Sequence, residues 1–184
     1  MKNSVGLVIT LLGSVYYPPS VVVTEPQTPV TTSIHARTMP PETMVQEVFA
    51  YFNQVRSKSC KCGTKRYSAA SPLVYNEKLA NAAQKHASWM ASSLKLTHSE
   101  PQRELANAGK RLTQAGYQWS VVAENVAAGQ PTAREVVDAW IQSPGHCKNL
   151  MDPAVKEVGI GFTYTNSGTY HYYWVADFAA PRKF

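Results

Sequence analysis

The spacing of apolar residues changes along this chain, and the change limits the folds that it can adopt. Apolar residues recur at helical spacing over residues 42–57, again after Asn76, and again after Thr132. Residues 158–164 instead alternate apolar with small or polar residues, and a turn signal separates them from an aromatic run at 170–178. Helices followed by a strand, another helix and a hairpin predict an α+β fold in which helices pack on a small sheet.

Capping patterns predict where the helices begin. Asn76 is suited to cap the second helix, and Thr132 has the spacing of a capping box for the fourth. Ser99 and Gln102 have the same spacing, so they predict the start of a third helix that ends at Gly116.

The first 41 residues differ in composition from the rest and contain six of the twelve prolines. Residues 1–15 join Lys2 to an apolar run and predict a signal peptide for secretion, with an uncleaved anchor or a wrongly assigned start as alternatives. Residues 16–41 predict a Pro-rich linker, and residues 42–184 the folded domain. We therefore expect a protein that is secreted or held in the periplasm or cell envelope. No apolar run reaches the roughly 18 residues of a membrane span, so we expect no transmembrane segment.

The chain has a net charge of +6, and part of that charge gathers in a basic loop at residues 56–66. Such a loop either binds anionic cell-wall polymer or lipid head groups or is simply solvated. No nucleic-acid-binding motif is present, so we expect no nucleic-acid partner. The sequence also lacks the common hydrolase and phosphate-binding signatures, and G-I-G at 159–161 predicts a closely packed strand because no helix follows it.

Three ionisable residues stand out by their surroundings. Glu124 lies in the otherwise apolar, strand-like stretch 121–127, where a carboxylate is costly unless it meets a donor, a cation or a metal. His98 and His146 lie in loop-like or helix-terminal stretches among small and polar residues, whereas His86 lies on a helical apolar stripe and is expected in the core. Two imidazoles and a carboxylate can hold a divalent cation. In the alternative interpretation, the carboxylate caps backbone groups and the two histidines are surface residues.

Several motifs, in order, resemble those of a known family. They are A-A-Q-K-H-A at 82–87, A-E-N-V-A at 123–127, S-P-G-H at 143–146, N-L-M at 149–151 and V-G-I-G at 158–161. Together they resemble the CAP superfamily, or SCP domain, which includes cysteine-rich secretory proteins, venom antigens and plant pathogenesis-related proteins. The resemblance is to its bacterial-type members and covers about residues 45–180. It implies a three-layer α-β-α sandwich with a central cleft lined by histidines and glutamates.

The resemblance places His98, Glu124 and His146 at three of the four positions of the family's cleft tetrad of two His and two Glu. Ser143 stands where the second glutamate would be. A single carboxylate gives no support to two-carboxylate acid/base chemistry, and a Ser143 nucleophile lacks a third, orienting group. A zinc ion held by His98 and His146 stays open, with Glu124 as a ligand or as a base that orients water.

The cysteines are also matched by the resemblance. The contexts Cys62-Gly63 and His146-Cys147 look like a pair of bacterial-type members, which implies a Cys62–Cys147 disulfide and a free Cys60. A bond between Cys60 and Cys62 would be strained. A zinc site of three thiols lacks standard spacing, and a Cys147 nucleophile activated by the adjacent His146 is a weaker alternative because neighbouring residues seldom face each other.

The function that the resemblance implies is an exported binding module rather than an enzyme. Its cleft would take a small-molecule, lipid or cell-envelope ligand, with a divalent cation as an optional helper. The alternatives are a metal-dependent hydrolase of peptide or cell-wall material and a purely structural role in the envelope.

Overall fold

The computed structural model describes residues 41–183. The predicted signal peptide and all of the predicted linker except Pro41 lie outside the described residues, so those two predictions remain untested. Within the described part of the chain, no helix combines the length and apolar character that a membrane span requires.

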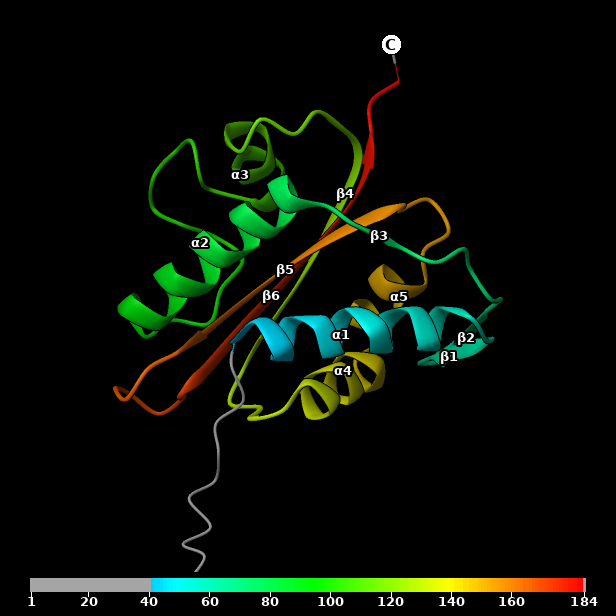
Figure 1. The fold of residues 1–184 in the computed structure, drawn as a ribbon, viewed down its shortest axis with the longest axis horizontal. Helices are drawn as coiled ribbons and strands as arrows, with labels where there is room; N and C mark the ends of the chain where they lie inside the picture. Colours follow the sequence, from blue (N-terminus) through cyan, green and yellow to red (C-terminus); the bar gives the residue numbers. More distant parts are fainter. Residues whose placement is uncertain (1–40, 184) are drawn as a thin grey trace, which may run out of the picture. The chain divides into compact units, whose positions relative to one another are not determined.

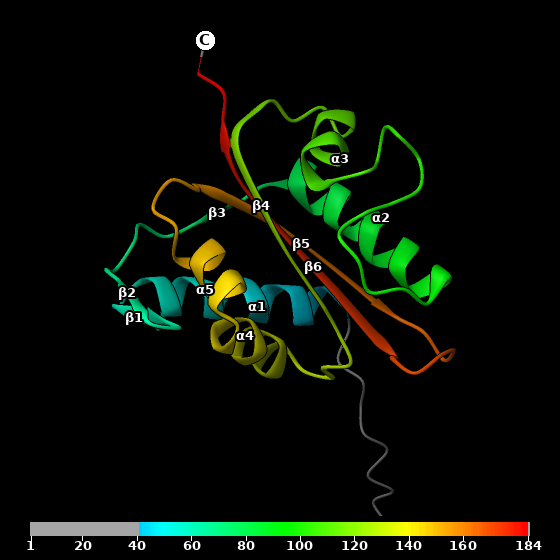
Figure 2. The same ribbon diagram turned by 180° about the vertical axis from the view of Figure 1, so that it is seen from behind.

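Residues 41–183 form five helices and two sheets. The helices are α1 (Pro41–Arg56), α2 (Glu77–Ser93), α3 (Ala108–Gln114), α4 (Ala133–Gln142) and α5 (Pro144–Met151). The larger sheet has the order β3 (Val74–Tyr75), β5 (Glu157–Tyr164), β6 (Tyr172–Pro181) and β4 (Trp119–Ala128), and the smaller sheet pairs β1 (Cys60–Cys62) with β2 (Lys65–Tyr67). Helices α2 and α3 lie on one face of the larger sheet, and α1, α4 and α5 lie on the other, as the two opposite views agree (Figures 1 and 2). The predicted three-layer α-β-α sandwich is confirmed.

Strand β5 shows why the two faces of the sheet differ. Val158 and Ile160 point toward the layer of α1 and α4, where they are buried in the largest apolar cluster. Gly159 and Gly161 alternate with them, and a Cβ atom at either glycine would collide with the backbone of α2. The absence of side chains therefore lets α2 lie directly on the strand, which confirms the predicted close packing of this segment.

Two of the predicted helix starts are confirmed. The Asn76 side chain accepts hydrogen bonds from the backbone N–H groups of Lys78 and Leu79, and Thr132 Oγ1 accepts one from Glu135. Each bond satisfies a donor that the first turn of a helix would otherwise leave without a partner.

The predicted start of the third helix at Ser99 is wrong. Helix α3 begins at Ala108, and the Asn107 side chain caps it by accepting from the Lys110 N–H. Residues 98–107 instead form turns and bends, and the Arg111 guanidinium donates to two backbone carbonyls of this segment, those of His98 and Leu105. Long-range contacts thus override a local capping pattern. Helix α5 was not expected from the sequence, because a proline usually ends a helix; here Pro144 follows α4 and occupies the first turn of a new helix.

The basic loop contains one residue that was misjudged from sequence. Arg56 is fully buried, and its guanidinium donates to the backbone carbonyls of Ser71, Leu150 and Asp152 at 2.8, 2.7 and 3.0 Å. Burial lowers its pKa below the ordinary arginine value. Arg56 therefore joins α1 to the end of α5 and cannot bind an anionic polymer, whereas the rest of the loop forms the β1–β2 hairpin and exposes Lys61, Lys65 and Arg66.

We expect Arg56→Met to lower the free energy of unfolding by about 2–4 kcal/mol, because several buried carbonyls would lose a charged donor. Arg66→Met is the matched control, since Arg66 is exposed and lies ten residues along the same basic segment; it should change stability by less than about 0.5 kcal/mol. Urea denaturation of both variants measures the difference. Equal losses in the two variants would contradict the structural role of Arg56.

Candidate functional site

Glu124 is the centre of the candidate site. It lies near the middle of β4, an edge strand of the larger sheet, directly opposite Asp177 of β6, which in turn lies opposite Gly159 of β5. Residues that face each other across strands share a face of the sheet, so Glu124 points toward the layer of α2 and α3. Its side chain is only 4% exposed, which means that its charge must be compensated inside the protein.

Two side chains compensate the Glu124 charge. One carboxylate oxygen lies 2.8 Å from His98 Nδ1, and the other accepts a hydrogen bond from the buried Arg111 guanidinium. Burial by itself raises the pKa of Glu124, but the hydrogen bond from His98 and the positive charge of Arg111 together hold that pKa below its ordinary value. Glu124 is therefore an ionised carboxylate in a nearly closed environment.

The contact with Glu124 fixes how His98 is oriented. An ionised carboxylate can only accept hydrogen bonds, so His98 Nδ1 must carry the proton that it shares with Glu124. Nε2 is then the nitrogen that remains for other partners, on a side chain that is 55% exposed. Arg111 reinforces this orientation, because it also donates to the His98 carbonyl at 3.1 Å. An exposed imidazole with a carboxylate behind one of its ring nitrogens is the usual arrangement of a histidine that binds a ligand or a metal.

His146 approaches the same region from the opposite layer. It lies in the first turn of α5 and is half-buried, and both burial and the neighbouring His98 lower its pKa below the ordinary histidine value. Asn125 holds it there, because the Asn125 Nδ2 group donates to the His146 carbonyl at 3.1 Å. Asn149 completes the link by donating to Asn125 Oδ1 at 2.9 Å. Ser143 precedes α5 and makes no capping hydrogen bond with its side chain.

The predicted set of metal ligands is not a closely packed cluster in this conformation. Among residues 41–183, the only three or more His, Cys, Asp or Glu side chains whose ligand atoms all lie within 4.8 Å of one another are those of Cys60, Cys62 and Cys147. Both oxygens of Glu124 are already bonded, so this residue is suited to orient His98 rather than to bind a cation itself.

A second buried pair supports the loop that carries His98. His86 is buried as predicted, with Nδ1 2.8 Å from Glu100 Oε1 and Nε2 2.9 Å from the Thr97 carbonyl. A carbonyl only accepts hydrogen bonds, so Nε2 carries a proton, and one further proton lies between Nδ1 and the Glu100 carboxyl. This pair fixes the residues on either side of His98.

Sequence reasoning missed Asp177, although the signal that identified Glu124 applies to it equally. Asp177 is an ionisable residue in an apolar strand, it is fully buried, and neither of its carboxyl oxygens has a hydrogen-bond partner among the described residues. Burial and the negative charge of Glu124 raise its pKa well above the ordinary value. Arg111 was not identified either, because the sequence around it predicts only a helix and does not indicate that Arg111 pairs with the buried Glu124.

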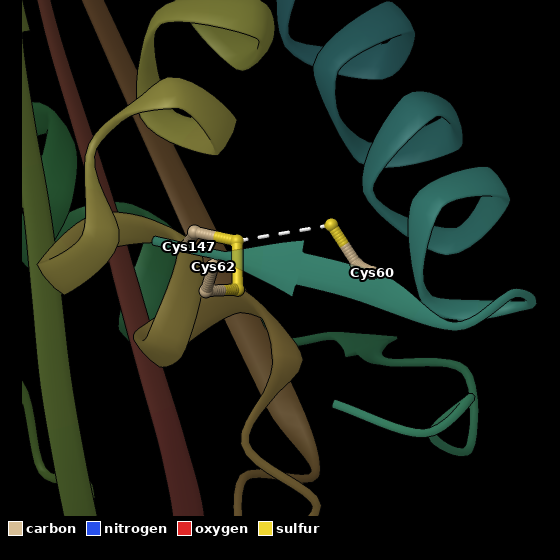
Figure 3. A group of neighbouring side chains, drawn as sticks. All are labelled: Cys60, Cys62 and Cys147. Atoms are coloured by element: carbon tan, nitrogen blue, oxygen red, sulfur yellow. Dashed lines mark hydrogen bonds between the residues drawn. A yellow bond between two sulfur atoms is a disulfide. The ribbon is translucent and has the colours of Figure 1, made fainter. Parts of the chain in front are cut away.

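A disulfide joins Cys62 of β1 to Cys147 of α5, with the two Cα atoms 5.4 Å apart, and Cys60 is free (Figure 3). This is the pairing that the family resemblance implied. The bond ties the basic hairpin to the helix that carries His146.

Asp177 should make the protein less stable as the pH rises. The folded state keeps a proton on Asp177 that the unfolded chain loses above about pH 3.8, so unfolding releases a proton and becomes more favourable by up to about 1.4 kcal/mol per pH unit until the folded-state pKa is reached. Asp177→Asn removes this contribution, so its stability relative to wild type should increase with pH. Unfolding curves between pH 4 and pH 8 measure the effect.

Asp152→Asn is the control for that experiment, since Asp152 is only partly buried and the amide oxygen can still accept from Ala154. If the Asp177 and Asp152 variants show the same pH profile relative to wild type, the buried, protonated Asp177 is excluded.

Comparison with known proteins places this chain in a family. The sequence model of the CAP (cysteine-rich secretory protein) family matches residues 49–178. Over 96 residues the chain is 30% identical to the uncharacterized protein YkwD of Bacillus subtilis (strain 168), a match that covers 52% of this chain and 37% of that protein. The chain thus spans little more than a third of this relative.

Two solved structures share the fold at low sequence identity. An extracellular SCP-domain protein from Bacillus anthracis str. Ames gives a TM-score of 0.61 at 22% identity, covering 76% of this chain and 41% of that one. An outer surface protein from Borrelia burgdorferi gives a TM-score of 0.64 at 17% identity, covering 78% of this chain and 97% of that one. The family match covers most of the chain, and the fold agrees with it: this protein belongs to the CAP, or cysteine-rich secretory protein, family.

Proposed function

We propose that the protein is an extracellular binding module whose cleft lies beside strand β4, between His98 and His146. The observation that carries the proposal is the fixed orientation of His98, whose Nδ1 is hydrogen-bonded to a buried carboxylate while its side chain is 55% exposed. A side chain held in this way loses little conformational entropy when a ligand binds, which favours recognition.

The charges around the cleft suit a hydroxyl-bearing ligand. The Glu124 charge is compensated by Arg111, and the lowered pKa of His146 keeps its imidazole neutral at pH 7. A neutral imidazole offers one donor and one acceptor, which matches the hydroxyl groups of lipids and cell-envelope glycans. The relatives described as extracellular and outer surface proteins are consistent with a ligand outside the cell.

A zinc ion could assist such binding. The ring nitrogens of His98 and His146 would hold it, and Glu124 would orient His98 from behind. When bound, zinc supplies a Lewis acid that polarises an oxygen of the ligand. The alternative, a metal-dependent hydrolase, also requires a carboxylate that is free to take a proton from water. Because Arg111 and His98 already occupy both oxygens of Glu124, the geometry favours binding over hydrolysis.

Zinc binding should depend on both histidines and on pH. We expect His98→Ala and His146→Ala each to reduce zinc affinity at pH 7 by at least about 100-fold, because each removes one of two ligands. Affinity should also fall as the pH drops below about 6.5, since only neutral imidazoles bind the ion. Isothermal titration calorimetry measures both effects. His171→Ala is the control, because His171 directly precedes β6, is exposed, and its Nδ1 lies 3.0 Å from the Thr165 carbonyl. Affinity that falls equally in all three variants would contradict the site.

The ligand itself can be sought with three hydroxyl-bearing probes: phosphatidylglycerol vesicles, a fluorescent sterol and purified peptidoglycan. We expect one of them to bind the wild-type protein and His171→Ala alike, and to bind the His98→Ala/His146→Ala double variant at least about tenfold more weakly, since the double variant lacks both cleft imidazoles. Binding that the double variant retains in full would contradict the proposed cleft. Release of peptide or glycan fragments from peptidoglycan, lost in the double variant, would establish the hydrolase alternative instead.

A further inference from the structure

Three sulfur atoms meet on the side of the molecule where hairpin β1–β2 packs against α5. All three lie within 4.8 Å of one another, although only Cys62 and Cys147 are bonded. The free Cys60 sulfur is 3.8 Å from the Cys147 sulfur, which is van der Waals contact (Figure 3). A thiol therefore lies in contact with a disulfide sulfur, but it is not in line with the Cys62–Cys147 bond, so the Cys60 side chain has to rotate before it can attack.

The geometry of β1 explains this arrangement. Successive side chains of a strand point to opposite sides, so Cys60 and Cys62 face α5 together while Lys61 between them is exposed. Helix α5 presents a single cysteine, Cys147, to both of them. Because either cysteine of β1 can reach the Cys147 sulfur, a Cys60–Cys147 disulfide is a direct alternative to the Cys62–Cys147 bond seen here.

We propose that the three cysteines form a thiol–disulfide exchange site. The Cys60 thiolate attacks Cys147 Sγ, a Cys60–Cys147 bond forms, the Cys62–Cys147 bond breaks, and Cys62 leaves as a thiolate that takes up the proton which Cys60 released. The number of disulfides is unchanged, so the step needs no oxidant or reductant. Attack on the Cys62 sulfur would instead form a Cys60–Cys62 disulfide, whose short ring is strained. The Cys60 thiolate therefore attacks the Cys147 sulfur.

Burial gives the exchange a consequence. Cys62 and Cys147 are 4% and 0% exposed, so thiols from solvent have little access to their bond, whereas Cys60 is only partly buried. Exchange replaces the buried Cys62–Cys147 bond with a Cys60–Cys147 bond, which includes the more exposed cysteine. An external thiol can then reduce the disulfide more readily. Cys147 follows His146 directly, so the exchange also changes which residue of the hairpin is tied to the helix that carries His146.

Peptide mapping tests the exchange directly, and the chain is well suited to it. Trypsin cleaves after Lys61 and so separates Cys60 from Cys62. The full-length protein is incubated at pH 8, its free thiols are trapped with N-ethylmaleimide, and unreduced peptides are identified by mass spectrometry. We expect label on both Cys60 and Cys62 and disulfide-linked peptides of both pairings, approached faster at higher pH because the thiolate is the attacking species. Label on Cys60 alone at every pH and time would overturn the proposal.

Two variants make the test independent of the equilibrium position. With oxidised glutathione as the oxidant, Cys62→Ser should form the Cys60–Cys147 disulfide in the folded protein, and failure to form it in a variant with native circular dichroism would count against exchange. Cys60→Ser should slow the reduction of Cys62–Cys147 by glutathione at least about tenfold, because the buried bond loses its internal attacker. Ser59→Ala is the matched control from the same hairpin and should be reduced at the wild-type rate. A Cys60→Ser protein that is reduced as fast as wild type would also overturn the proposal.

Discussion

The buried carboxylate of Glu124 imposes a constraint on which the arrangement of the site depends. A charge at this depth is tolerated only if a cation and a hydrogen-bond donor reach it, and Arg111 and His98 are those groups. Arg111 brings α3 against the sheet, and its bonds to the carbonyls of His98 and Leu105 shape the segment before that helix. The same ion pair that makes the carboxylate acceptable therefore also sets the position of His98.

The close packing of α2 on the sheet is the second feature on which the arrangement of the site depends. With glycines at 159 and 161, the helix backbone lies against β5, and small residues such as Ala83 and Ala87 continue the contact across the neighbouring strands. His86 of α2 lies beside the loop at 97–100, where Glu100 and the Thr97 carbonyl contact its two ring nitrogens. The loop that carries His98 is thus held from α2 and from α3 at once.

The opposite layer reaches the site around the edge of the sheet. Because β4 is the last strand, residues from both layers can approach it, and Asn125 and Asn149 attach α5 to it on the side away from Glu124. Arg56 supports the far end of α5, and the Cys62–Cys147 disulfide supports its first half. The position of His146 consequently depends on residues from α1, β1 and β4, which are far apart in the sequence.

The sequence by itself determined the helices and strands whose signals are local. The caps at Asn76 and Thr132, the alternation in β5 and the apolar stretch around Glu124 depend on neighbours within a few residues, and the structure agrees with each. Family motifs added the sandwich and the residues to inspect. Only the tertiary structure decided that Arg56 and Arg111 are buried, that Ser99 does not cap a helix, and that Asp177 is buried opposite Glu124. Each of these depends on a partner 13 to 99 residues away, as in the Arg111–Glu124 and Arg56–Val155 contacts, and the free energy of a buried charge is set by such partners and not by its neighbours in the chain.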